Sequence, residues 1–185
     1  MTPQHQRRSR RRRAGRNAEF GFTAAQVKKV TSLSYRQLND WDAKRVLPAG
    51  GGRGRAWRRF SPRDLFVIAV LARIRKDFGV PLERLHWLRT FMFRDGANHF
   101  RAASQKIEML GVGVYVVTNL RDFFVMDTDG EMGTTFAQGG LAGDCIWLEV
   151  NPLVNGIRAL LGEPELPRHG LGYRRRKLLE RNDEQ

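Results

Sequence analysis

The apolar positions of the chain follow a helical spacing in its first half and gather into short β-branched runs in its second half. Leu82, Leu85, Leu88 and Met92 recur every three or four residues after a proline, and this spacing predicts an amphipathic helix. The run Leu65–Ala72 is apolar almost all round, which is typical of a helix at the centre of a core. We therefore expect a helical N-terminal half built around the segment that contains this run.

One signal for the start of a helix recurs three times in that half. In each case a Ser or Thr is followed three residues later by Gln or Asp, with apolar residues beside both. The hydroxyl caps the helix, the apolar neighbours form a hydrophobic staple, and Gln completes a capping box in the first two cases. The signals predict helices over about 23–30 and 34–45, and a third from 61 to a glycine at 79. They stand at Thr23…Gln26, Ser34…Gln37 and Ser61…Asp64.

The insert between the second and third predicted helices is rich in glycine and arginine. Its sequence is GGGRGRAWRRF, at Gly50–Phe60. Leu47-Pro48 ends helical structure because proline disfavours helix in the residue before it. The glycines suit a flexible hairpin tip, and Ala56–Phe60 would be the returning strand. Two close helices followed by a basic hairpin indicate a winged helix-turn-helix.

The second half has a different pattern. Val112–Thr118, Phe123–Asp127 and Cys145–Val150 are predicted strands, since β-branched and aromatic residues favour strands. Ala97 to about Leu110 is a weaker helix that serves as a connector, and Pro152–Leu161 is a closing helix. The predicted fold class is α+β, with an N-terminal winged helix-turn-helix domain followed by a small C-terminal α/β module.

Charge divides the chain along the same lines. The net charge is +14, made up of +6 over residues 1–20, +10 over 21–95, −5 over 96–166 and +3 over 167–185. A polyanion should therefore meet the N-terminal half. We expect a disordered Arg-rich arm at 1–19, a winged-helix domain at 20–95 and a connecting helix at 96–111. The α/β module then covers 112–162, and a basic and polar tail covers 163–185.

Several function classes are excluded by what the sequence lacks. The single cysteine, Cys145, forms no internal disulfide and fits a reducing compartment. The longest apolar run is too short to cross a bilayer, and no apolar stretch follows the basic N-terminus as in a secretory signal. Scattered histidines predict no metal site, no cofactor motif is present, and no catalytic arrangement indicates an enzyme. We expect a cytoplasmic, nucleoid-associated protein; an organelle-targeting peptide is the alternative for the arm.

The second predicted helix has the side chains of a DNA-reading helix. Tyr35, Arg36 and Asn39 lie near its start and can point outward, while Leu38 and Trp41 face the core. Arg can pair with guanine, Asn with adenine, and Tyr can reach a phosphate or a thymine methyl group. The alternative is that all three are ordinary solvated helix residues.

The hairpin supplies a second set of candidate DNA contacts. Arg53, Arg55, Arg58 and Arg59 surround Trp57. Arginine suits phosphate, and glycine at the tip allows the backbone to approach a groove closely. Trp57 would pack either on the sugar-phosphate backbone or in the core of the hairpin, and the sequence does not decide between the two.

From residue 22 to residue 88 the chain resembles the DNA-binding domain of the MerR family of bacterial transcriptional regulators. The resemblance runs through FTAAQVKKVTSLSYRQLNDWDAKRVLP, AWRRFSPRDL and FGVPLERL. It implies DNA contacts by Arg36 and Arg58 first, with Tyr35 and Trp57 next. It also implies dimerisation, although the long dimerisation helix usual in the family has only a short counterpart here.

The predicted function is a sequence-specific transcriptional regulator that binds double-stranded DNA. It would act as a homodimer on a pseudo-palindromic operator, and RNA polymerase is a further candidate partner. An architectural or excisionase-like recombination protein is the alternative, because the Arg-rich arm adds sequence-independent affinity. The C-terminal module is open to two interpretations, a dimerisation or docking domain and a small-molecule sensor.

Overall fold

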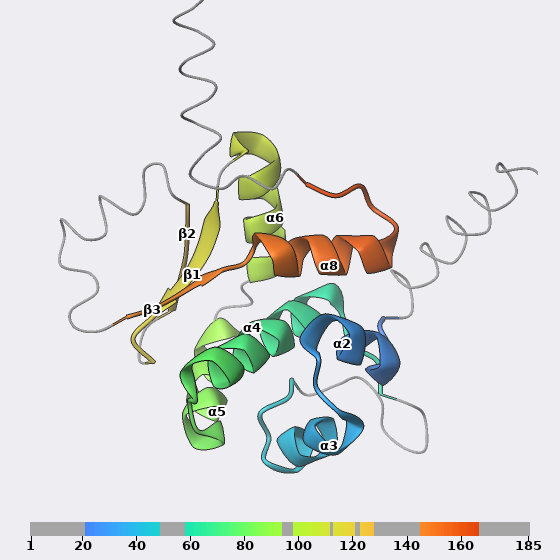
Figure 1. The fold of residues 1–185 in the computed structure, drawn as a ribbon, viewed down its shortest axis with the longest axis vertical. Coiled ribbons are helices and arrows are strands. Elements are labelled where there is room, and N and C mark those ends of the chain that lie inside the picture. The colour runs from blue at the N-terminus through green and yellow to red at the C-terminus, as the bar shows by residue number, and fades with distance from the viewer. Residues whose placement is uncertain are drawn as a thin grey trace, which may run out of the picture.

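The computed structural model describes residues 21–48, 58–93, 98–111, 113–120, 123–127 and 145–166. The described part of the chain is mixed α+β, with helices first and a small sheet later, which confirms the predicted fold class (Figure 1). Its elements are α2 (Ala24–Thr31), α3 (Tyr35–Ala43), α4 (Pro62–Phe78), α5 (Leu82–Met92), α6 (His99–Leu110), β1 (Val114–Thr118), β2 (Phe123–Asp127), β3 (Ile146–Glu149) and α8 (Asn151–Leu161).

The three predicted start signals all cap helices. At each one the Ser or Thr hydroxyl accepts a hydrogen bond from the backbone N–H three residues on, and the side chain there accepts one from the cap backbone. The third signal forms a full capping box as well, because the Asp64 carboxylate accepts from the Ser61 N–H at 2.9 Å. α4 ends where predicted, at Gly79 in the left-handed region with φ of 67°. Local signals therefore fix the limits of these helices.

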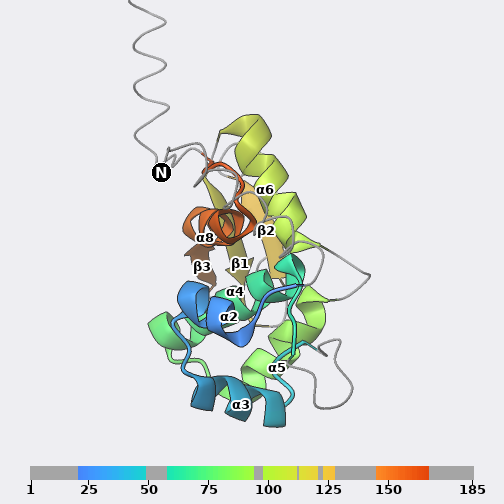
Figure 2. The same cartoon turned by 90° about the vertical axis from the view of Figure 1, so that its right-hand side faces the viewer.

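Helix α4 is the centre of the core. Every residue of Leu65–Ala72 is buried, as the apolar run predicts. The helix packs against α2 and α5 and also against α6, α8 and β3. In both ribbon views α3 and α5 lie on one side of α4, while α6 and α8 lie on the other (Figures 1 and 2). One cluster of buried apolar side chains runs from Phe22 to Leu166, so the predicted N-terminal domain and C-terminal module share a core.

The three strands form an antiparallel sheet in the order β2-β1-β3. In the central strand Val116 pairs with Val125 on one side and Leu148 on the other, and these residues face the shared core. Val117 faces the opposite way, among the half-buried Phe124 and Trp147. The sheet thus covers the core with one face and carries a small apolar cluster on the other.

The packed part of the chain continues past α8 into the first residues of the predicted tail. Leu166 is buried, and the Asn155 side chain holds its backbone with two hydrogen bonds of 2.9 Å, one to the N–H and one to the carbonyl. Arg158 is buried beside it, with its guanidinium 3.0 Å from the Ser104 hydroxyl and 3.2 Å from the Glu163 carboxylate. These polar side chains hold residues 163–166 against the core, a contact that the spacing of apolar residues does not predict.

Candidate nucleic-acid interface

Helices α2 and α3 form a helix-turn-helix pair. The turn contains Ser32, which takes a left-handed backbone conformation with φ of 60°, and Leu33, which is buried. On α3, Leu38 and Trp41 are buried as predicted, with Trp41 only 1% exposed. Because residues three apart lie on the same face of a helix, burial of these two leaves the opposite face of α3 open to solvent.

Of the predicted base-reading residues, Arg36 and Asn39 lie on that open face, and Tyr35 lies at its edge, three residues before Leu38. Tyr35, Arg36 and Asn39 are all exposed, and the Tyr35 side chain retains 51% of its accessible surface. The Lys28 ammonium lies 5.5 Å from the Tyr35 ring centroid, which places a cation from α2 beside α3.

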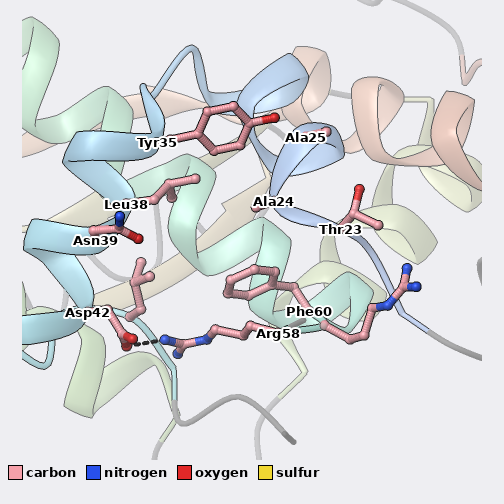
Figure 3. Close-up of a pocket in the computed structure, with 11 residues that line it drawn as sticks. Thr23, Ala24, Ala25, Tyr35, Leu38, Asn39, Asp42, Arg58 and Phe60 are labelled. Atoms are coloured by element: carbon pink, nitrogen blue, oxygen red, sulfur yellow. Dashed lines mark hydrogen bonds and ion pairs between the residues drawn. The ribbon is translucent and has the colours of Figure 1, made fainter. Parts of the chain in front are cut away.

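A groove of about 730 Å³ runs beside the open face of α3, along the side that carries Tyr35, Leu38 and Asp42. In Figure 3 Tyr35, Leu38, Asn39 and Asp42 project from one side of α3 across from Phe60. The start of α2 forms the end of the groove, and the chain at residues 58–60 forms the opposite wall. Its lining comprises Thr23, Ala24, Ala25, Tyr35, Leu38, Asn39, Asp42, Leu47, Arg58, Arg59 and Phe60.

Both carboxylates on α3 are paired with cations. Asp40 lies 3.4 Å from the Lys44 ammonium one turn later, and Asp42 forms an ion pair with Arg58 across the groove. Among the described residues Arg36 makes no ion pair. The pairing matters because an unpaired carboxylate on this face would repel a polyanion, whereas a free guanidinium would attract one.

The arginines of the predicted wing have different placements. Arg59 is exposed. Arg58 is only 23% exposed, and its guanidinium donates to the Asp42 carboxylate (Figure 3). It also donates to the Pro48 carbonyl. The other three wing candidates, Arg53, Arg55 and Trp57, lie outside the described residues. The wing candidates in the described part therefore comprise one solvent-facing arginine and one that is held within the protein.

The chain between α3 and the wing is held by α5, which the sequence did not indicate. Arg45 has a left-handed backbone, with φ of 55°, and its carbonyl lies 2.9 Å from His86 Nδ1 and 3.4 Å from an Arg89 guanidinium nitrogen. Burial, and after it the positive charge of Arg58, lowers the pKa of Arg89 from its usual value. His86 and Arg89 lie more than 40 residues from Arg45, so no local pattern could have found these contacts.

A metal site and a membrane span find no support in the described part of the chain. There, His, Cys, Asp and Glu side chains nowhere gather in groups of three or more that could hold a metal ion. The helices described are also too short or too polar to cross a membrane. The exposed face of α3 and the groove beside it are therefore the strongest candidate site.

Comparison with known proteins adds no family assignment to this geometry. No family model matches the chain, and a search of the curated proteins found no match. The resemblance of residues 22–88 to the MerR family stays a prediction from the residues that carry it. Any function must therefore be argued from the helix-turn-helix pair, its groove and its charges.

Proposed function

We propose that this protein is a sequence-specific DNA-binding transcriptional regulator that acts as a homodimer on a pseudo-palindromic site. The observation that carries the proposal is the open face of α3. It presents Tyr35, Arg36 and Asn39 to solvent while both carboxylates of the helix, Asp40 and Asp42, are paired with cations. A helix that follows a short turn and presents polar side chains from its N-terminal half is suited to the major groove.

Each part of the interface has a chemical role in this proposal. α3 is the recognition helix, on which Arg36 can donate two hydrogen bonds to guanine and Asn39 can pair with adenine. Arg59, exposed at the wall of the groove, supplies positive charge for a phosphate. The N-terminal arm carries seven arginines in residues 1–20, and these add affinity that does not depend on base sequence.

The test is selection of binding sites by the full-length protein from a pool of random-sequence DNA duplexes. We expect enrichment of one motif with two related half-sites, spaced by about one helical turn or a multiple of it. Sedimentation of the complex should give two protomers for each duplex. Recovery of a pool as random as the starting pool, at a salt concentration where the protein still binds DNA, would refute sequence-specific recognition.

Three alanine variants separate the proposed roles. Arg36→Ala should change the enriched base at one position of each half-site. Arg59→Ala should weaken binding to all sequences and reduce the slope of log affinity against log salt concentration by about one. Arg101→Ala is the matched control, because Arg101 is exposed on α6, on the opposite side of α4 from α3 (Figure 1). It removes the same charge, and we expect wild-type preference and nearly wild-type affinity.

A second candidate is an architectural or recombination accessory protein, and the arginine-rich sequence of residues 1–20 favours it. Such a protein would coat an attachment site with several protomers in tandem. The same sedimentation experiment distinguishes the two, because more than two protomers on an extended site would favour the accessory role. A single dimer on each selected duplex would favour the regulator.

A further inference from the structure

The side chain of Arg58 joins the two ends of the predicted wing to α3. We call residues 49–57 the wing segment; Pro48 precedes it and Arg58 follows it. The Arg58 guanidinium donates to the carbonyl of Pro48 and forms an ion pair with Asp42 near the end of α3. It also lies 5.0 Å from the centroid of the Phe60 ring. One side chain, from the residue that follows the wing segment, therefore contacts both the residue that precedes the segment and the end of α3.

The chain around Arg58 is fixed by other contacts. Phe60 forms an antiparallel bridge with Phe22, with hydrogen bonds of 2.6 and 2.9 Å between their backbones. Before the wing segment, the Val46 N–H donates to the Trp41 carbonyl at 2.8 Å. The chain before and after the wing segment is thus held by backbone hydrogen bonds. The Arg58 side chain links the two stretches through its contact with the Pro48 carbonyl.

Arg58 is the less exposed member of the pair, and its partial burial indicates a structural role for the guanidinium. The Arg58 side chain is 23% exposed, against 56% for Asp42. Arginine matches a carboxylate through a planar fork of donors, and a partly desolvated pair of this kind holds its geometry better than a fully exposed one. A guanidinium that already donates to a carboxylate and a carbonyl has fewer donors left for a phosphate.

We infer that Asp42 and Arg58 are positioning residues, which hold Pro48 and Arg58, the residues on either side of the wing segment, against the end of the recognition helix. The inference rests on the proposed DNA-binding function. It assigns Arg58 an effect on DNA affinity through the placement of α3 and the wing segment, in place of a direct phosphate contact. It also means that Asp42, although its negative charge would lie near DNA, strengthens DNA binding.

The sign of that effect provides the test. Removing a negative charge near DNA should tighten binding by simple electrostatics. If Asp42 positions the wing, Asp42→Asn should instead weaken binding to the selected duplex, by about tenfold for a coupled pair. Asp40→Asn is the matched control, since it removes the same charge from the same helix, and Asp40 pairs only with Lys44 among the described residues. We expect its affinity to stay within about twofold of wild type or to rise.

The probes are the duplex selected by the wild-type protein and a duplex of equal length and mixed sequence. Tighter or unchanged binding by Asp42→Asn, with wild-type selection intact, would overturn the positioning role and leave the proposed function standing. A wild-type protein that selects no sequence would instead remove the proposed function itself. Thermal unfolding of each variant shows whether a loss of affinity accompanies a loss of folded protein.

A second variant keeps the inference testable if Asp42→Asn folds poorly. Arg58→Lys keeps the positive charge, but a single ammonium does not reproduce the fork that reaches both Asp42 and the Pro48 carbonyl. We expect this variant to lose most of the affinity that Arg58→Gln loses. Wild-type affinity in Arg58→Lys would show that charge alone is needed, as a phosphate contact requires. In the Arg58→Gln background, Asp42→Asn should have no further weakening effect.

Discussion

The same substitution, glycine to alanine, should have opposite effects at two positions of this protein. Gly156 lies inside α8 at the contact with α2. A Cβ atom there would lie 3.8 Å from the nearest Val30 methyl carbon, which is ordinary van der Waals contact. Alanine in a helix interior is favoured over glycine by about 1 kcal/mol. Gly156→Ala should therefore stabilise the protein by about that amount and raise its melting temperature by about 2–4 °C.

Gly79 provides the matched case with the other sign. It ends α4 with φ of 67°, and a Cβ atom there would meet nothing within 4 Å. The cost of Gly79→Ala is therefore the backbone cost of the left-handed region, roughly 1 kcal/mol or more for alanine. Thermal and urea unfolding of the two variants and of the double variant measure these effects. A lower melting temperature for Gly156→Ala would mean that α2 and α8 pack more closely than described. A higher one for Gly79→Ala would contradict the left-handed cap.

Further expected outcomes concern α3, α6 and α8. Trp41→Ala should cost about 3–5 kcal/mol in the free energy of unfolding because the side chain is buried. Tyr35→Ala should cost less than about 1 kcal/mol, because the Tyr35 ring is half exposed and lies beside the Lys28 ammonium. Urea titration measures both free energies. Asn155→Ala should cost about 1–3 kcal/mol because it leaves the buried backbone of Leu166 without its partners, and an unchanged unfolding midpoint would show that the 163–166 segment does not dock in solution. Burial lowers the pKa of His99 from its usual 6.5, and the positive charge of Arg63 lowers it further. A hydrogen bond with the Met92 backbone raises this pKa, but the net shift is downward. The unfolded chain then takes up a proton at a higher pH than the folded protein, so stability falls as pH drops below about 6.5. His99→Gln should flatten that part of the stability curve, and an equal slope in both proteins would assign the acid sensitivity to other groups.

Sequence patterns predicted the elements well because their signals are local. A capping hydroxyl finds its partner three residues away, and β2, Phe123–Asp127, has the limits that its apolar run predicts. The polar contacts that join distant segments had no such signal. Arg158 meets Ser104 over 54 positions, and His86 meets the Arg45 carbonyl over 41. Long-range polar contacts of this kind follow no period, so they appear only once the fold has brought their elements together.

The same limit applies to the candidate site. The exposure of Arg36 and Asn39 followed from helical spacing, because burying Leu38 and Trp41 turns the opposite face outward, and Tyr35 lies at the edge of that face. The arginine-rich composition of the wing predicted phosphate contacts for both Arg58 and Arg59, and the family resemblance placed Arg58 first. Their placements differ because only Arg58 lies opposite a carboxylate on α3. Such a difference depends on the packing of one element against another.

The burial of α4 on both sides has a consequence for how this protein can be divided. A fragment ending near residue 95 would lack α6, α8 and the sheet, and would expose the side of α4 that they cover. The helix-turn-helix pair is therefore not an independent domain. Grafted alone onto another protein, it would expose an apolar surface that favours aggregation. The two halves should melt in one cooperative transition. Anything that loosens the acidic C-terminal half should then also reduce the population of chains in which α3 is folded, and with it the proposed DNA binding, with no ligand bound near α3.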